Sequence, residues 1–359
     1  MTVRSLHALI TGALLALVIP AAAQAATRTV YLGEPPANTK TFEQQYHSDA
    51  NDYFPRTVTI HKGDSVKFTP SGFHTVEIPA KGKAPAPIIV PGSAVSGHVD
   101  AAGAPFWFNG QPSLGFNPAI AMSNLFGGGK TKTYSGATGV QSGLPLSNHP
   151  KSFSVKFTKA GTFTYYCNLH AGMKGVVKVL SKSKHIPSSK AVAKTVKGQV
   201  AEDLAIAKSL ASYKPPAGVV SVGAAGEYGV EYYDFAPKTL SVPAGTTIKF
   251  QMATKSFEAH TATTGPGDPA TEPTSYLGKL AASLNSPSFA PEATYPSDVP
   301  GTPASLTPTF HGNGFWNSGF LAANLPPLPA SNSVKFSAPG TYQFYCLIHP
   351  FMHGTITVT

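Results

Sequence analysis

Apolar and polar residues alternate in two pairs of short segments that lie about half a chain apart. The first pair is Phe54–Ile60 and Val66–Phe68, and the second is Ala236–Val242 and Ile248–Phe250. A glycine separates the two segments of each pair. Alternation with a period of two predicts strands with one buried face, and the glycine predicts a turn between them. The pattern therefore predicts an all-β chain that contains the same unit twice.

The similarity of the two halves continues downstream in unchanged register. The segments Ser154–Phe157, Gly161–Thr162 and Tyr166–Cys167 recur as Ser333–Phe336, Gly340–Thr341 and Tyr345–Cys346. Each half also ends on one further predicted strand, Gly175–Val179 and Gly354–Val358. The repeat predicts two domains, each large enough to bury the core of a sandwich.

The chain has two cysteines, and both lie in the same C-x2-H-x2-M spacing. Just beyond each early pair of strands, one histidine precedes a threonine, at His74 and at His260. A thiolate, two imidazoles and a weakly bound axial thioether are the donor set of a blue-copper electron-transfer site. The sequence therefore predicts two such sites.

With these residues the chain resembles the cupredoxin family, in particular its plastocyanin, amicyanin and pseudoazurin branch. The short spacing between cysteine, histidine and methionine is similar to that of amicyanin and pseudoazurin. The resemblance covers about half of the chain after the N-terminal segment, and it implies a Greek-key β-sandwich for each half. Carried over residue by residue, it implies these copper ligands: His74, Cys167, His170 and Met173 in the first half, and His260, Cys346, His349 and Met352 in the second.

We expect a first domain over 27–180 and a second over 218–359, joined by a linker over 181–217. Within the linker, apolar residues recur at helical spacing from 190 to 213, which predicts one helix with a packing face. Long insertions are expected at about 79–150 and 261–329, because these stretches are rich in Gly, Pro, Ser and Ala. Both contain a cluster of aromatic residues and glycine. We interpret these clusters as packing that anchors the insertion, with an apolar docking surface as the alternative.

Only 12% of the residues are charged, while 34 are Gly and 33 are Pro, which is typical of turn-rich β domains. Residues 1–25 combine Arg4, an apolar run from Leu6 and the small-residue end Ala23-Gln24-Ala25, and they predict a secretory signal peptide. We therefore expect an exported protein, periplasmic or extracellular, without a stable membrane span. A retained membrane anchor is the less favoured alternative. The net charge of +10 could steer acidic redox partners, and no pattern indicates nucleic-acid binding.

The predicted function is a one-electron carrier with a donor and an acceptor protein, and not an enzyme. A copper oxidase or a nitrite reductase-like subunit would need additional histidines, whereas Tyr166 and Tyr345 precede the two cysteines and the chain has no H-x-H. A copper-handling protein would be richer in methionine. A disulfide between Cys167 and Cys346 would not require the His and Met that follow each cysteine. His311 is the alternative to His260 as second imidazole, and the sequence leaves the oligomeric state open.

Overall fold

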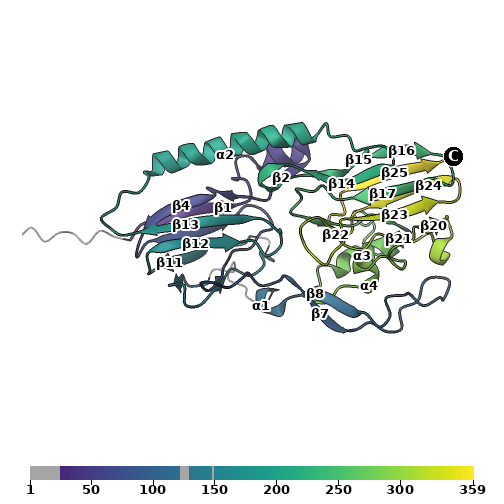
Figure 1. The fold of residues 1–359 in the computed structure, drawn as a ribbon, viewed down its shortest axis with the longest axis horizontal. Helices are drawn as coiled ribbons and strands as arrows, with labels where there is room; N and C mark the ends of the chain where they lie inside the picture. Colours follow the sequence, from purple (N-terminus) through teal and green to yellow (C-terminus); the bar gives the residue numbers. More distant parts are fainter. Residues whose placement is uncertain (1–24, 122–128, 148) are drawn as a thin grey trace, which may run out of the picture.

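Two β-sandwiches lie side by side along the long axis of the molecule, and one long helix, α2 (Ser189–Leu210), runs along one side of the first toward the second (Figure 1). The computed structural model describes residues 25–121, 129–147 and 149–359. The predicted signal peptide lies outside these residues, apart from Ala25. The expected fold class, two tandem sandwiches and a linker with one helix, is confirmed. Among the described residues, no helix has both the length and the apolar character needed to cross a bilayer.

The first sandwich is built on the alternating segments that the sequence predicts. Its strands are β1 (Thr27–Leu32), β3 (Tyr53–Phe54), β4 (Thr57–His61), β5 (Ser65–Pro70), β6 (Glu77–Ile78), β9 (Lys132–Tyr134), β10 (Val140–Gln141), β11 (Phe153–Phe157), β12 (Gly161–Tyr166) and β13 (Lys174–Leu180). They form two five-stranded sheets with the orders β3-β1-β5-β11-β9 and β10-β6-β12-β13-β4. The apolar positions of β4 and β5 (Val58, Ile60, Val66 and Phe68) are buried between the sheets, which accounts for the period-two pattern.

The second sandwich repeats this arrangement. Its strands are β14 (Val219–Ala225), β15 (Val230–Ala236), β16 (Thr239–Val242), β17 (Thr247–Gln251), β19 (Thr263–Thr264), β20 (Ala304–Leu306), β21 (Trp316–Asn317), β23 (Ser331–Phe336), β24 (Gly340–Tyr345) and β25 (His353–Val358), with a separate pair β18 (Ala259–His260) and β22 (Leu321–Ala322). Parallel pairing of β16 with β25 matches that of β4 with β13, and β14 with β17 matches β1 with β5. The internal repeat of the sequence is therefore a repeat of strand order.

A segment of the first half crosses to the second sandwich. After a short π-helix, η1 (Thr41–Gln45), strand β2 (Ser48–Ala50) pairs antiparallel with β15, and Ala50 lies opposite Val230. The six-stranded sheet of the second sandwich therefore has the order β2-β15-β14-β17-β23-β20. Our domain boundaries stay a prediction. Strand β2 lies within the range expected for the first domain, but its hydrogen bonds with β15 make it a strand of the second sandwich. The pairing of β2 with β15 links the two halves through backbone hydrogen bonds.

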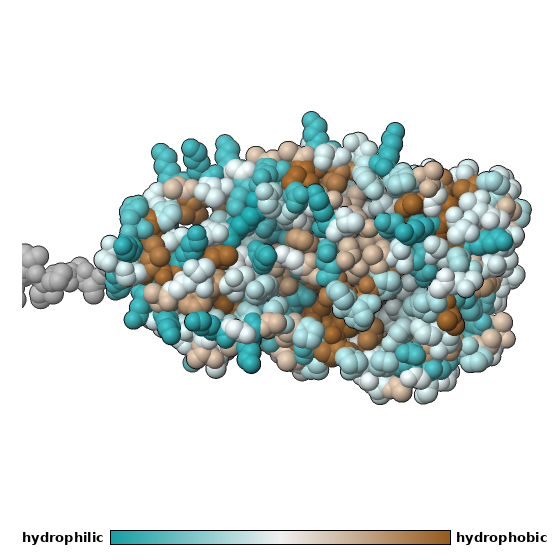
Figure 2. Space-filling view, viewed as in Figure 1, coloured by the Kyte–Doolittle hydropathy of each residue, from teal (hydrophilic) through white to brown (hydrophobic). Residues whose placement is uncertain are grey.

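The two insertions pack on one another. In the first, β7 (Ile89–Ala94) and β8 (Pro112–Phe116) form a hairpin followed by α1 (Pro118–Ala121), and the second contains α3 (Tyr276–Ser283), α4 (Pro291–Thr294) and η4 (Phe310–Gly312). Phe106 and Phe108 share one buried cluster with Leu277 and Phe315, and Trp107 Nε1 donates to the Pro296 carbonyl at 2.8 Å. Figure 1 shows the hairpin beneath the second sandwich, where Figure 2 shows an apolar area at the surface. The aromatic clusters thus anchor the insertions, as we interpreted them.

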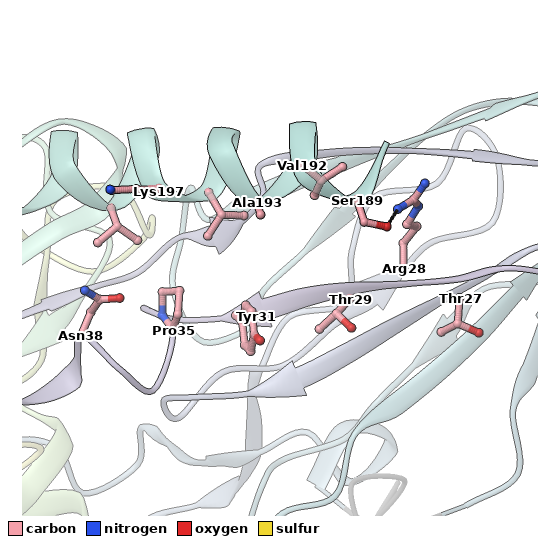
Figure 3. Close-up of a pocket in the computed structure, with 12 residues that line it drawn as sticks. Thr27, Arg28, Thr29, Tyr31, Pro35, Asn38, Ser189, Val192, Ala193 and Lys197 are labelled. Atoms are coloured by element: carbon pink, nitrogen blue, oxygen red, sulfur yellow. Dashed lines mark hydrogen bonds between the residues drawn. The ribbon is translucent and has the colours of Figure 1, made fainter. Parts of the chain in front are cut away.

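The helix α2 uses its apolar stripe for packing. Its C-terminal half buries Val200, Ala207 and Leu210 against Phe42 and Phe54. Its N-terminal half stands away from β1 and leaves a cavity of about 470 Å³, which Figure 3 shows with Ser189 and Arg28 joined at one end by a hydrogen bond of 2.7 Å. Ser188 caps the helix, because its hydroxyl accepts from the Ala191 amide. The linker helix therefore belongs to the fold and is not a free tether.

Candidate metal centres

The structure brings the four predicted residues of the first half to one end of the first sandwich. Cys167 directly follows the last residue of β12, and His170 and Met173 lie on the loop into β13, while His74 follows β5. The Nδ1 atoms of His74 and His170 are 2.9 Å apart, and Cys167 Sγ lies 3.4 Å from His170 Nδ1. All four side chains are buried. Two imidazoles and a thiol thus converge with their donor atoms facing one another.

The second half makes the same arrangement. Cys346 Sγ lies 3.6 Å from His260 Nδ1 and 3.8 Å from His349 Nδ1, and the two Nδ1 atoms are 3.1 Å apart. Met352 is buried at the corresponding place on the loop into β25. His311, the alternative second imidazole, is not brought here, because its Nδ1 is 2.8 Å from an Asp100 carboxylate oxygen. His260 is the histidine at this site.

The cysteines are free and buried, each within its own site. The alternative of a disulfide between Cys167 and Cys346 is therefore wrong. Burial raises the pKa of the Cys346 thiol to about 11. Burial acts in the same direction on Cys167, but the neighbouring His170 and His74 imidazoles outweigh it and hold the pKa of this thiol well below its usual range.

Each ligand loop is closed by the same backbone hydrogen bonds. The amide of each cysteine donates to the methionine carbonyl at 3.1 Å, and the methionine amide donates to the histidine carbonyl, at 3.0 Å in the first loop and 2.8 Å in the second. The C-x2-H-x2-M spacing is the length that this closed turn requires. The turn holds the three side chains on one side of the loop.

The threonine after each upstream histidine has a role that the sequence analysis did not recognise. The amides of Thr75 and Thr261 each donate to the cysteine sulfur at 3.4 Å. Their hydroxyls accept from the backbone amide that follows the cysteine, at 2.7 Å in the first site and 2.8 Å in the second. Such donors stabilise a thiolate and fix its position. The recurrence of the His-Thr pair in the sequence was the signal for this contact.

The donor atoms fit a copper ion. In each site one Sγ and two Nδ1 atoms lie within 4.8 Å of one another, and neither group includes a carboxylate. Sulfur and imidazole donors suit copper, whereas magnesium and calcium require oxygen. Both thiols and three of the four imidazoles are buried, which leaves little room for a hydration shell around the ion, and only His349 is partly exposed. The residues present therefore match a metal bound by protein atoms alone.

The two sites face one another across the contact between the sandwiches, and Glu258 lies between them. Its carboxylate is 3.1 Å from His170 Nε2 and 3.9 Å from His349 Nε2. Asn51 Nδ2 and the Tyr233 hydroxyl donate to the same carboxylate at 2.9 Å and 2.7 Å. Burial alone would raise the pKa of Glu258, but the neighbouring histidines hold it well below its usual range. The sequence carried no signal for this residue beyond its position two residues before His260.

A cavity of about 390 Å³ opens beside Glu258 and reaches both sites. Its lining includes His74, His170 and His349, and Phe73 and Phe351 stand at its edge. These two phenylalanines are 49% and 60% exposed, which is unusual for large apolar side chains. The ring edges of both sites are therefore reached from one shared opening.

Known proteins are similar to parts of this chain. No family model matches the chain. Amicyanin-alpha of Methylorubrum extorquens is 54% identical over 35 residues, which is 9% of this chain and 29% of that protein. The chain thus matches less than a third of the length of this relative. Both halves of the chain have a cupredoxin-like fold, as the strand order and the converging His and Cys side chains show.

Solved structures of blue copper proteins also match. Plastocyanin from the fern Dryopteris crassirhizoma is 25% identical, covers 39% of this chain and 99% of its own, and has a TM-score of 0.21. Auracyanin A from Chloroflexus aurantiacus is 20% identical, covers 39% and 96%, and has a TM-score of 0.25.

Proposed function

We propose that this protein is an exported blue copper protein that carries single electrons, with one type 1 copper site in each half. The ligands are His74, Cys167, His170 and Met173 in the first site, and His260, Cys346, His349 and Met352 in the second. The observation that carries the proposal is the same convergence of one buried thiol and two Nδ1 atoms at the same place in both sandwiches. Copper bound in such a site supplies a one-electron couple between Cu(I) and Cu(II).

The surrounding residues support rapid electron exchange. The closed ligand loops and the threonine contacts hold the donors in place, so a change of charge at the metal requires little movement of the protein. The core of each sandwich shields the cysteine sulfur from water, and the thioethers of Met173 and Met352 would tune the potential of a bound copper ion as weak ligands. Electrons would enter and leave through the imidazole edges that reach the shared cavity.

A carrier is favoured over the other functions that the sequence left open. A copper oxidase or nitrite reductase-like enzyme would connect the cysteine loop to a second copper through a histidine next to the cysteine, and Tyr166 and Tyr345 occupy that place. A copper-handling protein would expose its ligands, whereas both thiols here are buried. The net charge of +10 suits donor and acceptor proteins with acidic surfaces.

The test is a titration of the purified protein with Cu(II), followed by its intense visible thiolate-to-copper band and by metal analysis. Two equivalents and a blue product are expected, because the two donor sets are alike. Cys167→Ser and Cys346→Ser should each retain one blue site, and the double variant none. A wild-type protein without the band, or a double variant that keeps it, would contradict the proposal.

A further inference from the structure

We propose that the Glu258 carboxylate joins the two metal centres into one electron-exchanging pair, along the path from His170 through Glu258 to His349. This inference rests on the proposed function. Its basis is that a single side chain contacts a ligand histidine of each site, with Nε2 to oxygen distances of 3.1 Å and 3.9 Å. The path between the two imidazoles therefore crosses one hydrogen bond, at His170, and one gap of 3.9 Å, at His349.

The chemistry of the contact suits a bridge. An imidazole that uses Nδ1 as its metal-facing atom carries its hydrogen on Nε2, so both histidines present a donor toward Glu258. The Glu258 carboxylate accepts from His170 Nε2 at 3.1 Å and faces His349 Nε2 at 3.9 Å, which is an electrostatic contact and not a hydrogen bond, whereas an amide has no charge to offer the second ring. Asn51 and Tyr233 hold the carboxylate in this position. The group is also buried, so water competes little for it.

The protein is built asymmetrically around this contact. Glu258 stands two residues before His260, and the corresponding residue of the first half is Gly72, so a single carboxylate serves both sites. The first ligand loop rests on the segment beside it, because the Ala171 amide donates to the Phe257 carbonyl at 3.0 Å. Gly172 makes this approach possible: a Cβ there would lie 2.4 Å from the Phe257 ring, and the residue has a φ of +126°.

The proposed step is the transfer of one electron from the reduced site to the oxidised one. No bond forms or breaks, and both Nε2 hydrogens remain in place, so no proton has to leave the buried contact. A one-electron donor protein supplies the electron and a one-electron acceptor protein removes it. The consequence is that an electron accepted at either site becomes available at both.

The experiment uses the full chain loaded with copper, with Met173→Leu introduced so that the sites differ in potential and visible spectrum. A pulse of reducing radicals reduces the sites at random, and the absorbance then reports their re-equilibration. We expect a fast phase whose rate does not depend on protein concentration. Glu258→Gln should lose this phase, because the amide breaks one of the two contacts. A sample with two blue sites and no such phase would overturn the inference and leave the proposed function standing.

The matched control is Glu231→Gln. Glu231 is buried in the same contact region and accepts from the Phe257 amide, so its replacement also removes a buried carboxylate there. This variant should keep the fast phase, and equal rates in both variants would overturn the bridge. A second readout is the NMR signal of the Nε2 hydrogens in the diamagnetic Cu(I) protein. The His170 signal should be protected from exchange in the wild type and in Glu231→Gln and should lose protection in Glu258→Gln; an unprotected wild-type signal would count against the contact itself.

Discussion

The linker helix carries a buried carboxylate whose removal should change how stability depends on pH. Asp203 on α2 is fully buried, and one of its oxygens accepts from Arg56 at 2.7 Å while the other has no hydrogen-bond partner. Burial and the nearby charge of Asp52 raise the pKa of Asp203 from 3.8 to about 8, despite the opposing effect of Arg56. The perturbation we consider is Asp203→Asn, which keeps the shape of the side chain and removes its charge.

The sign follows from proton binding. Because the folded protein holds the Asp203 proton more tightly than the unfolded chain does, the contribution of this carboxyl to stability is greatest below about pH 4 and is lost as the pH rises through about 8. The part of this shift that lies between pH 5 and pH 8 is about three pH units, which corresponds to at most about 4 kcal/mol at about 1.36 kcal/mol per unit. Part of this energy comes from repulsion between Asp203 and Asp52, and the surroundings can relax once Asp203 is replaced by a neutral residue. We therefore expect about 2 kcal/mol, or roughly 3 °C in the unfolding midpoint of a chain of this length.

The assay is thermal unfolding of the wild type and of Asp203→Asn at several pH values between 5 and 9. The variant should lose less stability than the wild type as the pH rises, and it should be the more stable protein at pH 9. Glu202→Gln is the matched control, because Glu202 lies on the same helix and bonds to the same Arg56 but is largely exposed. Its profile should parallel the wild type. An Asp203→Asn profile with the wild-type slope would refute the assignment of this pH dependence to Asp203.

Three further predictions test the sites and the insertions. Replacing Met173 or Met352 with Leu should shift the potential of one site and leave its copper bound, since an axial ligand is weak; voltammetry with metal analysis checks this. His260→Ala should halve the copper content and His311→Ala should leave it unchanged, and the reverse result would show that the second site is wrongly assigned. Phe108→Ala should lower the free energy of unfolding by about 3–5 kcal/mol in urea unfolding, because its ring is fully buried; an unchanged midpoint would place the first insertion outside the core.

The sequence was most informative where local pattern and repetition coincide. Alternation along β4 and β5 predicts strands because each buries one face, and the same alternation recurs in β16 and β17. The ligand loops were readable because a closed turn of this length leaves few places for the cysteine, histidine and methionine. The choice of His260 over His311 rested on the His-Thr pair that it shares with His74 and on the place of His311 inside the insertion, and the structure supports it by geometry.

The sequence was least informative about contacts between distant segments. Strand β2 is three residues long, and its pairing with β15 depends on the path of the chain through η1, which no local pattern encodes. The hairpin of β7 and β8 is rich in small residues and proline, so its alternation is weak. The two insertions pack on one another through particular pairs of aromatic residues, which the sequence does not reveal. Composition indicates only that aromatic residues are able to anchor a loop.

The orientation of the two sites explains why the repeats diverge near the ligands. A domain that presents its histidine edge to solvent can keep any small or apolar residue beside it, whereas two such edges that meet can share one charged partner. Glu258 accepts from His170 Nε2 and lies 3.9 Å from His349 Nε2, so one carboxylate faces both rings, and the corresponding residue of the first half is Gly72. The ligand loops differ for the same reason: Gly172 lies under the Phe257 ring, whereas Phe351 at the equivalent position is exposed at the edge of the cavity. The differences between the repeats are therefore concentrated where the two halves contact one another, which is where a paired function would place them.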